Sequence, residues 1–236
     1  MKGKFQFVAF DADDTLWHTE PLYIQTQTEF TRLLSAYHSP EWIDQKLYQT
    51  EMRNLQLFGY GIKAFVLSMI ETAIELTEGR IQGSEIQQII DQGRKMLASE
   101  IRLLDGVSET VAALAQTHPL MLITKGDLID QEVKLARSGL GDYFQSFEVT
   151  SDKTAPVYKA ILTKHSIEPQ RFLMVGNSLR SDILPVVELG AKAVYIPYAL
   201  TWAHESGERP QPGLPGYYEL DSIVNLPKLV EQIESA

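Results

Sequence analysis

The second half of this chain alternates short apolar segments with longer amphipathic ones, and this alternation limits the fold more than any other feature. Strands are expected near Phe5 to Phe10, Leu120 to Thr124, Phe147 to Thr150, Phe172 to Val175 and Ala193 to Ile196. Helices are expected at Val107 to Gln116, Leu128 to Ser138, Ala155 to His165, Asp182 to Leu189, and after Asp221. Repeated strand–helix units predict an α/β fold, a parallel sheet with helices on both faces joined by right-handed crossovers.

The segment from Pro21 to about Ala98 has a different, purely helical pattern. Apolar residues recur with helical spacing over Leu22 to Leu34, Trp42 to Leu57, Ile62 to Leu76 and Ile86 to Leu97. Glycine and proline interrupt the period at Ser39-Pro40, at Gly59-Tyr60-Gly61 and between Glu78 and Ser84. We expect four consecutive helices that pack as a small bundle of their own.

The composition excludes several classes of protein. The 236 residues include 31 acidic and 21 basic side chains, a formal charge of -10, which argues against nucleic-acid or anionic-membrane partners. Cysteine is absent, which rules out disulfides, thiolate metal sites and cysteine nucleophiles. The N-terminal residues lack a signal-peptide pattern and no apolar stretch is long enough to span a membrane, so we expect a cytoplasmic location. The sequence does not indicate an oligomeric state.

The first strand ends in three carboxylates within four residues, Asp11, Asp13 and Asp14. Buried carboxylates this close together repel one another unless a cation or a set of hydrogen-bond donors lies among them. In an extended chain Asp11 and Asp13 point to the same side, so that one can bind or attack while the other handles a proton. The alternative interpretation is an acidic loop in which Asp13 or Thr15 caps a helix.

Two further segments place polar groups at strand ends. Thr124-Lys125-Gly126-Asp127 follows one predicted strand and supplies a hydroxyl, backbone N–H groups and a glycine, a combination that is typical of phosphate binding. Gly176-Asn177 follows another and precedes Asp182, and such amide and carboxylate oxygens suit Mg²⁺. The alternative interpretation makes Asp127, Ser181 and Asp182 helix caps.

Lys153 precedes a helix that begins near Pro156. Its ammonium would reach the same sheet edge and hold an attacking carboxylate and a phosphoryl group together. Most lysines are solvated and have no specific role, which is the alternative interpretation here.

Taken in order, these segments resemble the four motifs of the haloacid dehalogenase-like hydrolase superfamily: Asp11-x-Asp13-x-Thr15-Leu16, Thr124, Lys153 and Gly176-Asn177-Ser178-x-x-Ser181-Asp182. The resemblance covers essentially the whole chain, because the helical block lies where that superfamily has a helical cap. It implies a Rossmann-like catalytic core formed by residues 1–16 and 99–236, and an inserted cap domain formed by residues 17–98.

The resemblance implies a role for each motif residue. Asp11 would be the nucleophile that forms an aspartyl-phosphate, and Asp13 the general acid and base. Thr124, Lys125, Gly126 and Lys153 would bind the phosphoryl group. Mg²⁺ would be held by Asp11, the main-chain carbonyl of Asp13, Asn177 and Asp182. The implied activity is magnesium-dependent hydrolysis of a phosphomonoester of a small metabolite.

The chain departs from the superfamily pattern at three positions. Asn177 stands where members commonly have Asp, so metal coordination there uses a neutral amide oxygen or moves to Asp182. Asp14 and Lys125 stand where Gly and Asn are frequent; we expect Asp14 to cap a helix and Lys125 to add a phosphate contact. Members that remove halide from haloacids lack the second aspartate, so Asp13 favours a phosphate ester, although a phosphonate or phosphoanhydride is also compatible.

Substrate choice is expected to depend on the helical block. Tyr60 and Lys63, at and after a glycine-flanked turn, are candidates to contact the leaving group, as are Trp17 and His18 after the first motif. The alternative is a plain helix connection for the first pair and a hinge for the second. Nucleotide monophosphates, sugar phosphates and phosphorylated acids all fit. A phosphotransferase of the same chemistry and a non-catalytic binding protein on the same fold are the two alternative functions.

Overall fold

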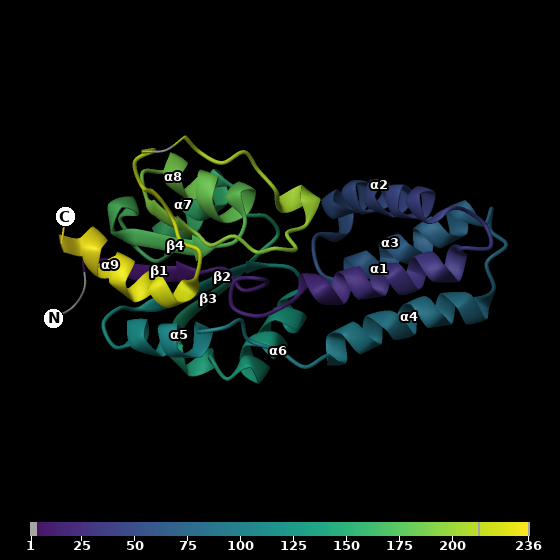
Figure 1. The fold of residues 1–236 in the computed structure, drawn as a ribbon, viewed down its shortest axis with the longest axis horizontal. Helices are drawn as coiled ribbons and strands as arrows, with labels where there is room; N and C mark the ends of the chain where they lie inside the picture. The colour runs from purple at the N-terminus through teal and green to yellow at the C-terminus, as the bar shows by residue number, and fades with distance from the viewer. Residues whose placement is uncertain (1–3, 212, 236) are drawn as a thin grey trace. The chain divides into compact units, whose positions relative to one another are not determined.

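The computed structural model describes residues 4–211 and 213–235 of the chain (Figure 1). It contains six strands: β1 (Phe7–Phe10), β2 (Leu120–Lys125), β3 (Phe144–Thr150), β4 (Phe172–Gly176), β5 (Lys192–Tyr195) and β6 (Tyr217–Glu219). Its α-helices are α1 (Glu20–Leu34), α2 (Pro40–Phe58), α3 (Ile62–Leu76), α4 (Gly83–Ala98), α5 (Val107–Ala115), α6 (Leu128–Ser138), α7 (Ala155–Lys164), α8 (Leu184–Glu188) and α9 (Leu226–Ser235). A π-helical turn, Leu179–Ile183, precedes α8.

The strands form one sheet in the order β3-β2-β1-β4-β5-β6. The pairs β2–β1, β1–β4, β4–β5 and β5–β6 are parallel, which confirms the predicted α/β class with a Rossmann-like sheet. β6 was missed, because the sequence analysis treated its residues as part of a loop. The helix expected from Asp182 instead begins as the π-helical turn at Leu179.

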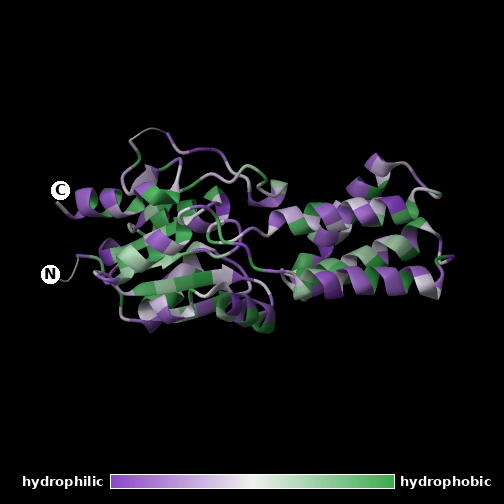
Figure 2. Cartoon of the chain, turned by 60° about the horizontal axis from the view of Figure 1, so that its bottom comes forward, coloured by the Kyte–Doolittle hydropathy of each residue, from purple (hydrophilic) through white to green (hydrophobic). Residues whose placement is uncertain are grey.

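Alternate residues of the central strands pack on opposite faces of the sheet. Val8 and Phe10 of β1 belong to the apolar cluster that includes residues of α5 and α9, whereas Ala9 belongs to the cluster that includes α7 and α8. Both faces are therefore covered by helices, as parallel sheets require. Figure 2 shows the strands coloured as predominantly apolar, and helices that combine apolar and polar residues.

The chain divides into two compact units. One consists of residues 1–20, 101–124 and 132–236 and contains most of the sheet; the other consists of residues 21–100 and 125–131. In the second unit all four helices contribute to one apolar core, with Phe30 from α1, Leu47 from α2, Met69 from α3 and Ile89 from α4. Its role as a cap domain stays a proposal.

The breaks between the helices of the second unit fall where glycine and proline interrupt the helical pattern. Ser39 accepts the N–H of Trp42 at 3.4 Å to cap α2, and Pro40 occupies the first turn. Gly59 and Gly61 have positive φ angles and separate α2 from α3. Among the described residues, no helix is both long and apolar enough to cross a membrane.

Candidate active site

The candidate site lies at the carboxyl edge of the sheet, where the order of strands reverses. β1 is flanked by β2, which follows it in the chain, and by β4, and in open α/β sheets ligands bind at such a switch point. Phe10 pairs with Leu122 of β2 and with Val175 of β4. Two residues beyond these partners, Thr124 lies near the end of β2 and Asn177 directly follows β4, on either side of Asp11.

Asp11 is buried and forms an ion pair with Lys153. The Lys153 ammonium donates to Asp11 Oδ1 in a short contact and to Asp182 Oδ1 at 2.8 Å. Asp11 is 7% exposed, Lys153 2% and Asp182 1%. Three residues from separate motifs thus meet in one buried cluster, and this rejects the interpretation of Lys153 as a solvated surface residue.

Two carboxylates share one ammonium in this cluster, and the pKa values reflect the imbalance. Burial raises the pKa of Asp11 to about 7, against the lowering effect of Lys153, and the charge of Asp182 raises it further. For Lys153, burial opposes the charged form, but Asp11 and Asp182 outweigh it and hold the pKa of the lysine well above its usual value. The site therefore holds a fixed positive charge beside a carboxylate that an additional cation would help to ionise.

Asp182 is oriented by the π-helical turn and by Gly176. Its Oδ2 accepts the N–H of Ser178 at 3.0 Å, while its Oδ1 accepts Lys153. Any Cβ at position 176 would overlap the Asp182 side chain, so glycine is needed there. Both Asp182 oxygens accept hydrogen bonds, so Asp182 is a charge partner for Lys153. Its predicted role as a metal ligand stays a proposal.

Asn177 faces the same hydroxyl group as Asp11. Thr15 Oγ1 lies 3.0 Å from Asp11 Oδ2 and 3.1 Å from Asn177 Oδ1. No cluster of three or more Asp, Glu, His or Cys that could hold a metal ion occurs in the described part of the chain. The nearby oxygens of Asp11 and Asn177 are of the hard type that Mg²⁺ prefers, so the donor chemistry fits this ion.

Asp13 is held by donors from three side chains. Its Oδ1 accepts the indole N–H of Trp17 at 2.8 Å and the hydroxyl of Thr19 at 2.7 Å. Lys134 of α6 places its ammonium 3.1 Å from Oδ1 and 3.4 Å from Oδ2. The Asp13 side chain keeps 28% of its surface exposed, more than the Asp11 side chain, and can therefore exchange protons.

Asp14 caps α1, as the sequence analysis expected. It has a positive φ of 62°, and its carboxylate accepts the N–H groups of Thr19 and Glu20 at 2.8 to 3.1 Å. Burial raises the pKa of Asp14 to about 6, against the effect of these hydrogen bonds. The same interpretation had been open for Asp13, but the contacts of its carboxylate described above are with the side chains of Trp17, Thr19 and Lys134.

The residues predicted to bind phosphate divide between the two units. Thr124 is buried at the end of β2 in the first unit. Lys125 and Gly126 belong to the second unit, where the Lys125 ammonium lies 4.0 Å from the centroid of the Tyr60 ring. Their role as a phosphate-binding set stays a proposal.

Tyr60 and Lys63 contact the segment that runs from the last residue of β2 to the start of α6. Lys63 Nζ lies 2.9 Å from Asp127 Oδ1, and Asp127 also accepts the N–H of Asp130 at 3.1 Å, which confirms its alternative interpretation as a helix cap. Gly61 approaches the same segment closely, because a Cβ there would lie 3.2 Å from the Asp127 nitrogen. The turn is therefore more than a plain connection, and its part in substrate choice stays a proposal.

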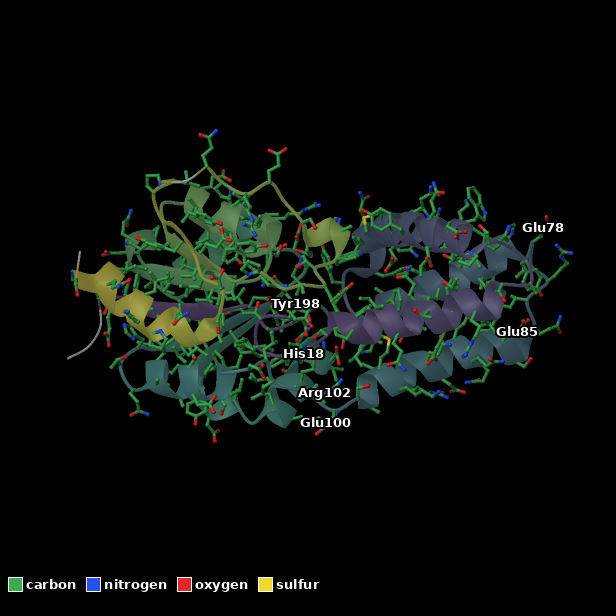
Figure 3. All side chains as sticks on the ribbon, viewed as in Figure 1. His18, Glu78, Glu85, Glu100, Arg102 and Tyr198 are labelled. Carbon is green, nitrogen blue, oxygen red and sulfur yellow. The ribbon has the colours of Figure 1, made fainter. Side chains whose placement is uncertain are left out.

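Trp17 and His18 have different environments. Trp17 is completely buried and its indole N–H donates to Asp13, and its predicted contact with substrate stays a proposal. His18 is exposed, and its Nδ1 lies 2.8 Å from the Tyr198 hydroxyl (Figure 3). Burial raises the pKa of Tyr198 to about 12, with a further effect of Asp14. His18 remains a candidate for substrate contact.

Sequence reasoning missed several residues of the site, chiefly Lys134, Thr19 and the role of Thr15. Lys134 is 7% exposed although lysine is rarely buried, and it lies one turn after the buried Asp130. Leu128 and Ile129 are exposed on the same helix. The available signal was the pattern of α6, in which polar residues occupy inward-facing positions and apolar residues occupy neighbouring exposed ones.

An open parallel sheet with a buried aspartate–lysine pair at its carboxyl edge, and a second aspartate two residues after the first, defines a Rossmann-like α/β enzyme. The family model for haloacid dehalogenase-like hydrolases matches residues 5–190, and the chain belongs to this family.

Three similar proteins illustrate the relationship. The crystal structure of a haloacid dehalogenase-like family hydrolase from Xanthomonas campestris has 41% sequence identity and a TM-score of 0.88, covering 99% of this chain and 93% of that one. The pyrimidine 5'-nucleotidase YjjG of Escherichia coli is 22% identical over 82% of this chain and 86% of its own. The glyceraldehyde 3-phosphate phosphatase of Pyrococcus furiosus is 29% identical over 104 residues, so the match spans only 43% of that relative's length.

Proposed function

We propose that this hydrolase is a magnesium-dependent phosphatase that cleaves a phosphomonoester of a small metabolite through an aspartyl-phosphate on Asp11. The observation that carries the proposal is the pair of differently held aspartates: Asp11 is buried against Lys153, whereas Asp13 is more exposed and surrounded by donors. One group is suited to attack and the other to proton transfer.

In the first step an Asp11 oxygen attacks phosphorus, and the bond between phosphorus and the substrate's alcohol oxygen breaks. Asp13 gives a proton to the departing oxygen. Lys153, with Asp182 fixing its ammonium at 2.8 Å, offsets negative charge on Asp11 and on the phosphoryl group. Thr124, Lys125 and Gly126 are proposed to bind the remaining phosphoryl oxygens.

In the second step the Asp13 carboxylate takes a proton from water, which attacks phosphorus. Inorganic phosphate leaves and Asp11 returns to its free form. Mg²⁺, when bound, would supply charge neutralisation between the attacking carboxylate and the phosphoryl group. Asp11, the main-chain carbonyl of Asp13, Asn177 and Asp182 are the groups that we propose to hold it.

Asp13 also supports phosphate esters over haloacids as substrates. A halide leaves without a proton, so an acid held beside the nucleophile would have no task in dehalogenation. The named relatives act on a pyrimidine nucleotide and on glyceraldehyde 3-phosphate, two small phosphate esters of different chemistry. We propose a substrate of this general class, with specificity depending on His18, Tyr60 and Lys63.

The test is phosphate release from a panel of phosphorylated metabolites and p-nitrophenyl phosphate, with Mg²⁺ and with EDTA. We expect turnover with Mg²⁺ only, and a loss of at least about 10³-fold in D11N. Hydroxylamine, which traps an acyl phosphate as a hydroxamate, should modify Asp11 during turnover. Activity that persists in D11N would refute the nucleophile, and phosphate transferred to an added alcohol would identify a phosphotransferase.

A further inference from the structure

The unusual feature that the proposed function does not use is the buried Lys134. Lysine side chains are almost never buried without a partner, because removing an ammonium from water is costly. Lys134 is nevertheless 7% exposed, on a helix far along the chain from the first motif, and its ammonium contacts both oxygens of Asp13 at 3.1 and 3.4 Å.

Lys134 acts on Asp13 together with two neighbours. Trp17 and Thr19 donate to Oδ1 of the carboxylate, at 2.8 and 2.7 Å. An aspartate can rotate about two side-chain bonds, and three donors that converge on one carboxylate limit that rotation. Trp17 is itself fully buried, so its indole provides a rigid reference for the carboxylate plane.

We propose that Lys134 is a positioning residue for the proton transfer by Asp13, together with Thr19 and Trp17. This inference rests on the proposed phosphatase function and goes beyond it by assigning Lys134 to protonation of the leaving group. The ammonium fixes the carboxylate at the side of the site where the substrate's alcohol departs. It does not bind the phosphoryl group, which is the task of Lys153.

If Lys134 has this role, the effect of removing it should depend on the leaving group of the substrate. An alkyl alcohol is a poor leaving group and needs a well-placed proton, whereas p-nitrophenol leaves readily without one. Misplacing Asp13 should therefore impair alkyl phosphates more than p-nitrophenyl phosphate. A lysine that bound phosphate, or one with a purely structural role, would affect both substrates alike.

The experiment compares kcat and KM of wild type and K134M for glycerol phosphate or another accepted alkyl phosphate and for p-nitrophenyl phosphate. We expect kcat for the alkyl phosphate to fall about 10- to 100-fold, and that for p-nitrophenyl phosphate by less than about 3-fold, with KM little changed. K159M, which removes an exposed lysine of α7, is the matched control and should keep the wild-type ratio. An equal fall on both substrates, or an altered ratio in K159M as well, overturns the inference.

A second variant keeps the test decisive if K134M does not fold. T19V is nearly isosteric and removes one hydrogen bond to Asp13. It should shift the ratio of the two kcat values in the same direction and by a smaller factor, and an unchanged ratio overturns the inference. Failure of the proposed function would look different, because wild type itself would then hydrolyse neither substrate.

Discussion

The main chain of Gly176 lies directly against the carboxylate of Asp182. A Cβ on residue 176 would overlap Oδ2, Cγ and Cβ of Asp182, whose other oxygen accepts the Lys153 ammonium. The glycine at the end of β4 therefore allows Asp182 to hold Lys153 beside Asp11. The close approach makes this glycine a precise test of whether the charge cluster matters for activity.

We expect G176A to lower phosphatase activity by about 10²-fold, because a shift of about 1 Å in a catalytic group has effects of this size. The displaced Asp182 would no longer hold Lys153 against Asp11. The measurement is kcat/KM with Mg²⁺, together with thermal unfolding. G83A is the matched control, since a Cβ on Gly83 meets no atom within 4 Å. Near wild-type activity in a folded G176A would contradict the proposed dependence.

Removing the Lys153 ammonium should destabilise the protein as well as inactivate it. K153M leaves the carboxylates of Asp11 and Asp182 buried without their partner, a change that typically costs about 3 to 5 kcal/mol. Loss of a nearby positive charge raises the pKa of Asp11 further above its ordinary value, so the loss of stability grows as the pH rises through the neutral range.

The check is urea denaturation of K153M and wild type at pH 5 and pH 8 in metal-free buffer. The difference in free energy of unfolding should be larger at pH 8, because ionising the buried Asp11 costs more when the Lys153 ammonium is absent. K159M serves as the surface control and should match wild type at both values of pH. A difference that is equal at pH 5 and 8 would argue against an electrostatic origin.

Much of the fold was accessible from sequence because its physical signals are local. The strands next to β1 are short apolar runs, and the breaks between helices coincide with glycine and proline. Since parallel strands end at the same edge of a sheet, Asp11, Lys153 and Asp182 were correctly expected to meet. By contrast β6 has three residues and follows a loop rich in glycine and proline, which is too short for a periodic pattern.

The other features of the candidate site depend on side-chain orientations, which the spacing of residues along the chain does not specify. The hydrogen bonds of Asp182 with Lys153 and with the Ser178 N–H group depend on the π-helical turn, which the sequence pattern does not indicate. Lys134 reaches Asp13 only because α6 turns that side chain inward. Trp17 follows the first motif directly, yet nothing in the sequence distinguishes a buried indole beside Asp13 from an exposed one beside substrate.

Packing within the second unit can be tested where Gly93 of α4 faces Val66 of α3. A Cβ on Gly93 would overlap a methyl group of Val66, whose branched side chain has little freedom to move. G93A should therefore lower the free energy of unfolding by about 1 to 3 kcal/mol through overpacking.

V66A creates the missing space, so the double variant V66A/G93A should be more stable than the sum of the single effects predicts. Chemical denaturation of the four proteins measures this coupling, and strictly additive effects would exclude the contact as the cause; G83A, on the same helix, should be neutral.

Glu20, at the start of α1, predicts a pH dependence of stability that is separate from the catalytic cluster. Burial raises its pKa from 4.5 to about 7, and the charges of Asp14 and Glu205 contribute. Between pH 4.5 and about 7, Glu20 keeps its proton in the folded state and loses it in the unfolded state. Stability contributed by the neutral form is therefore lost as the pH rises from about 4.5 to 7, and is constant above that range. E20Q cannot ionise and should be more stable than wild type by about 1 to 3 kcal/mol at pH 8.

The two proteins should differ little in stability at pH 4.5, where Glu20 is protonated in the folded state and only partly ionised in the unfolded state. Denaturation in metal-free buffer at pH 4.5, 6 and 8 gives the curve for each protein, and the gap between E20Q and wild type should widen over this series. E132Q, at an exposed position of α6, provides the control for losing a carboxylate and should show a constant difference. If the difference in free energy of unfolding between E20Q and wild type had its full size already at pH 4.5, new contacts of the amide would explain it. Burial of the Glu20 charge would then not be the cause.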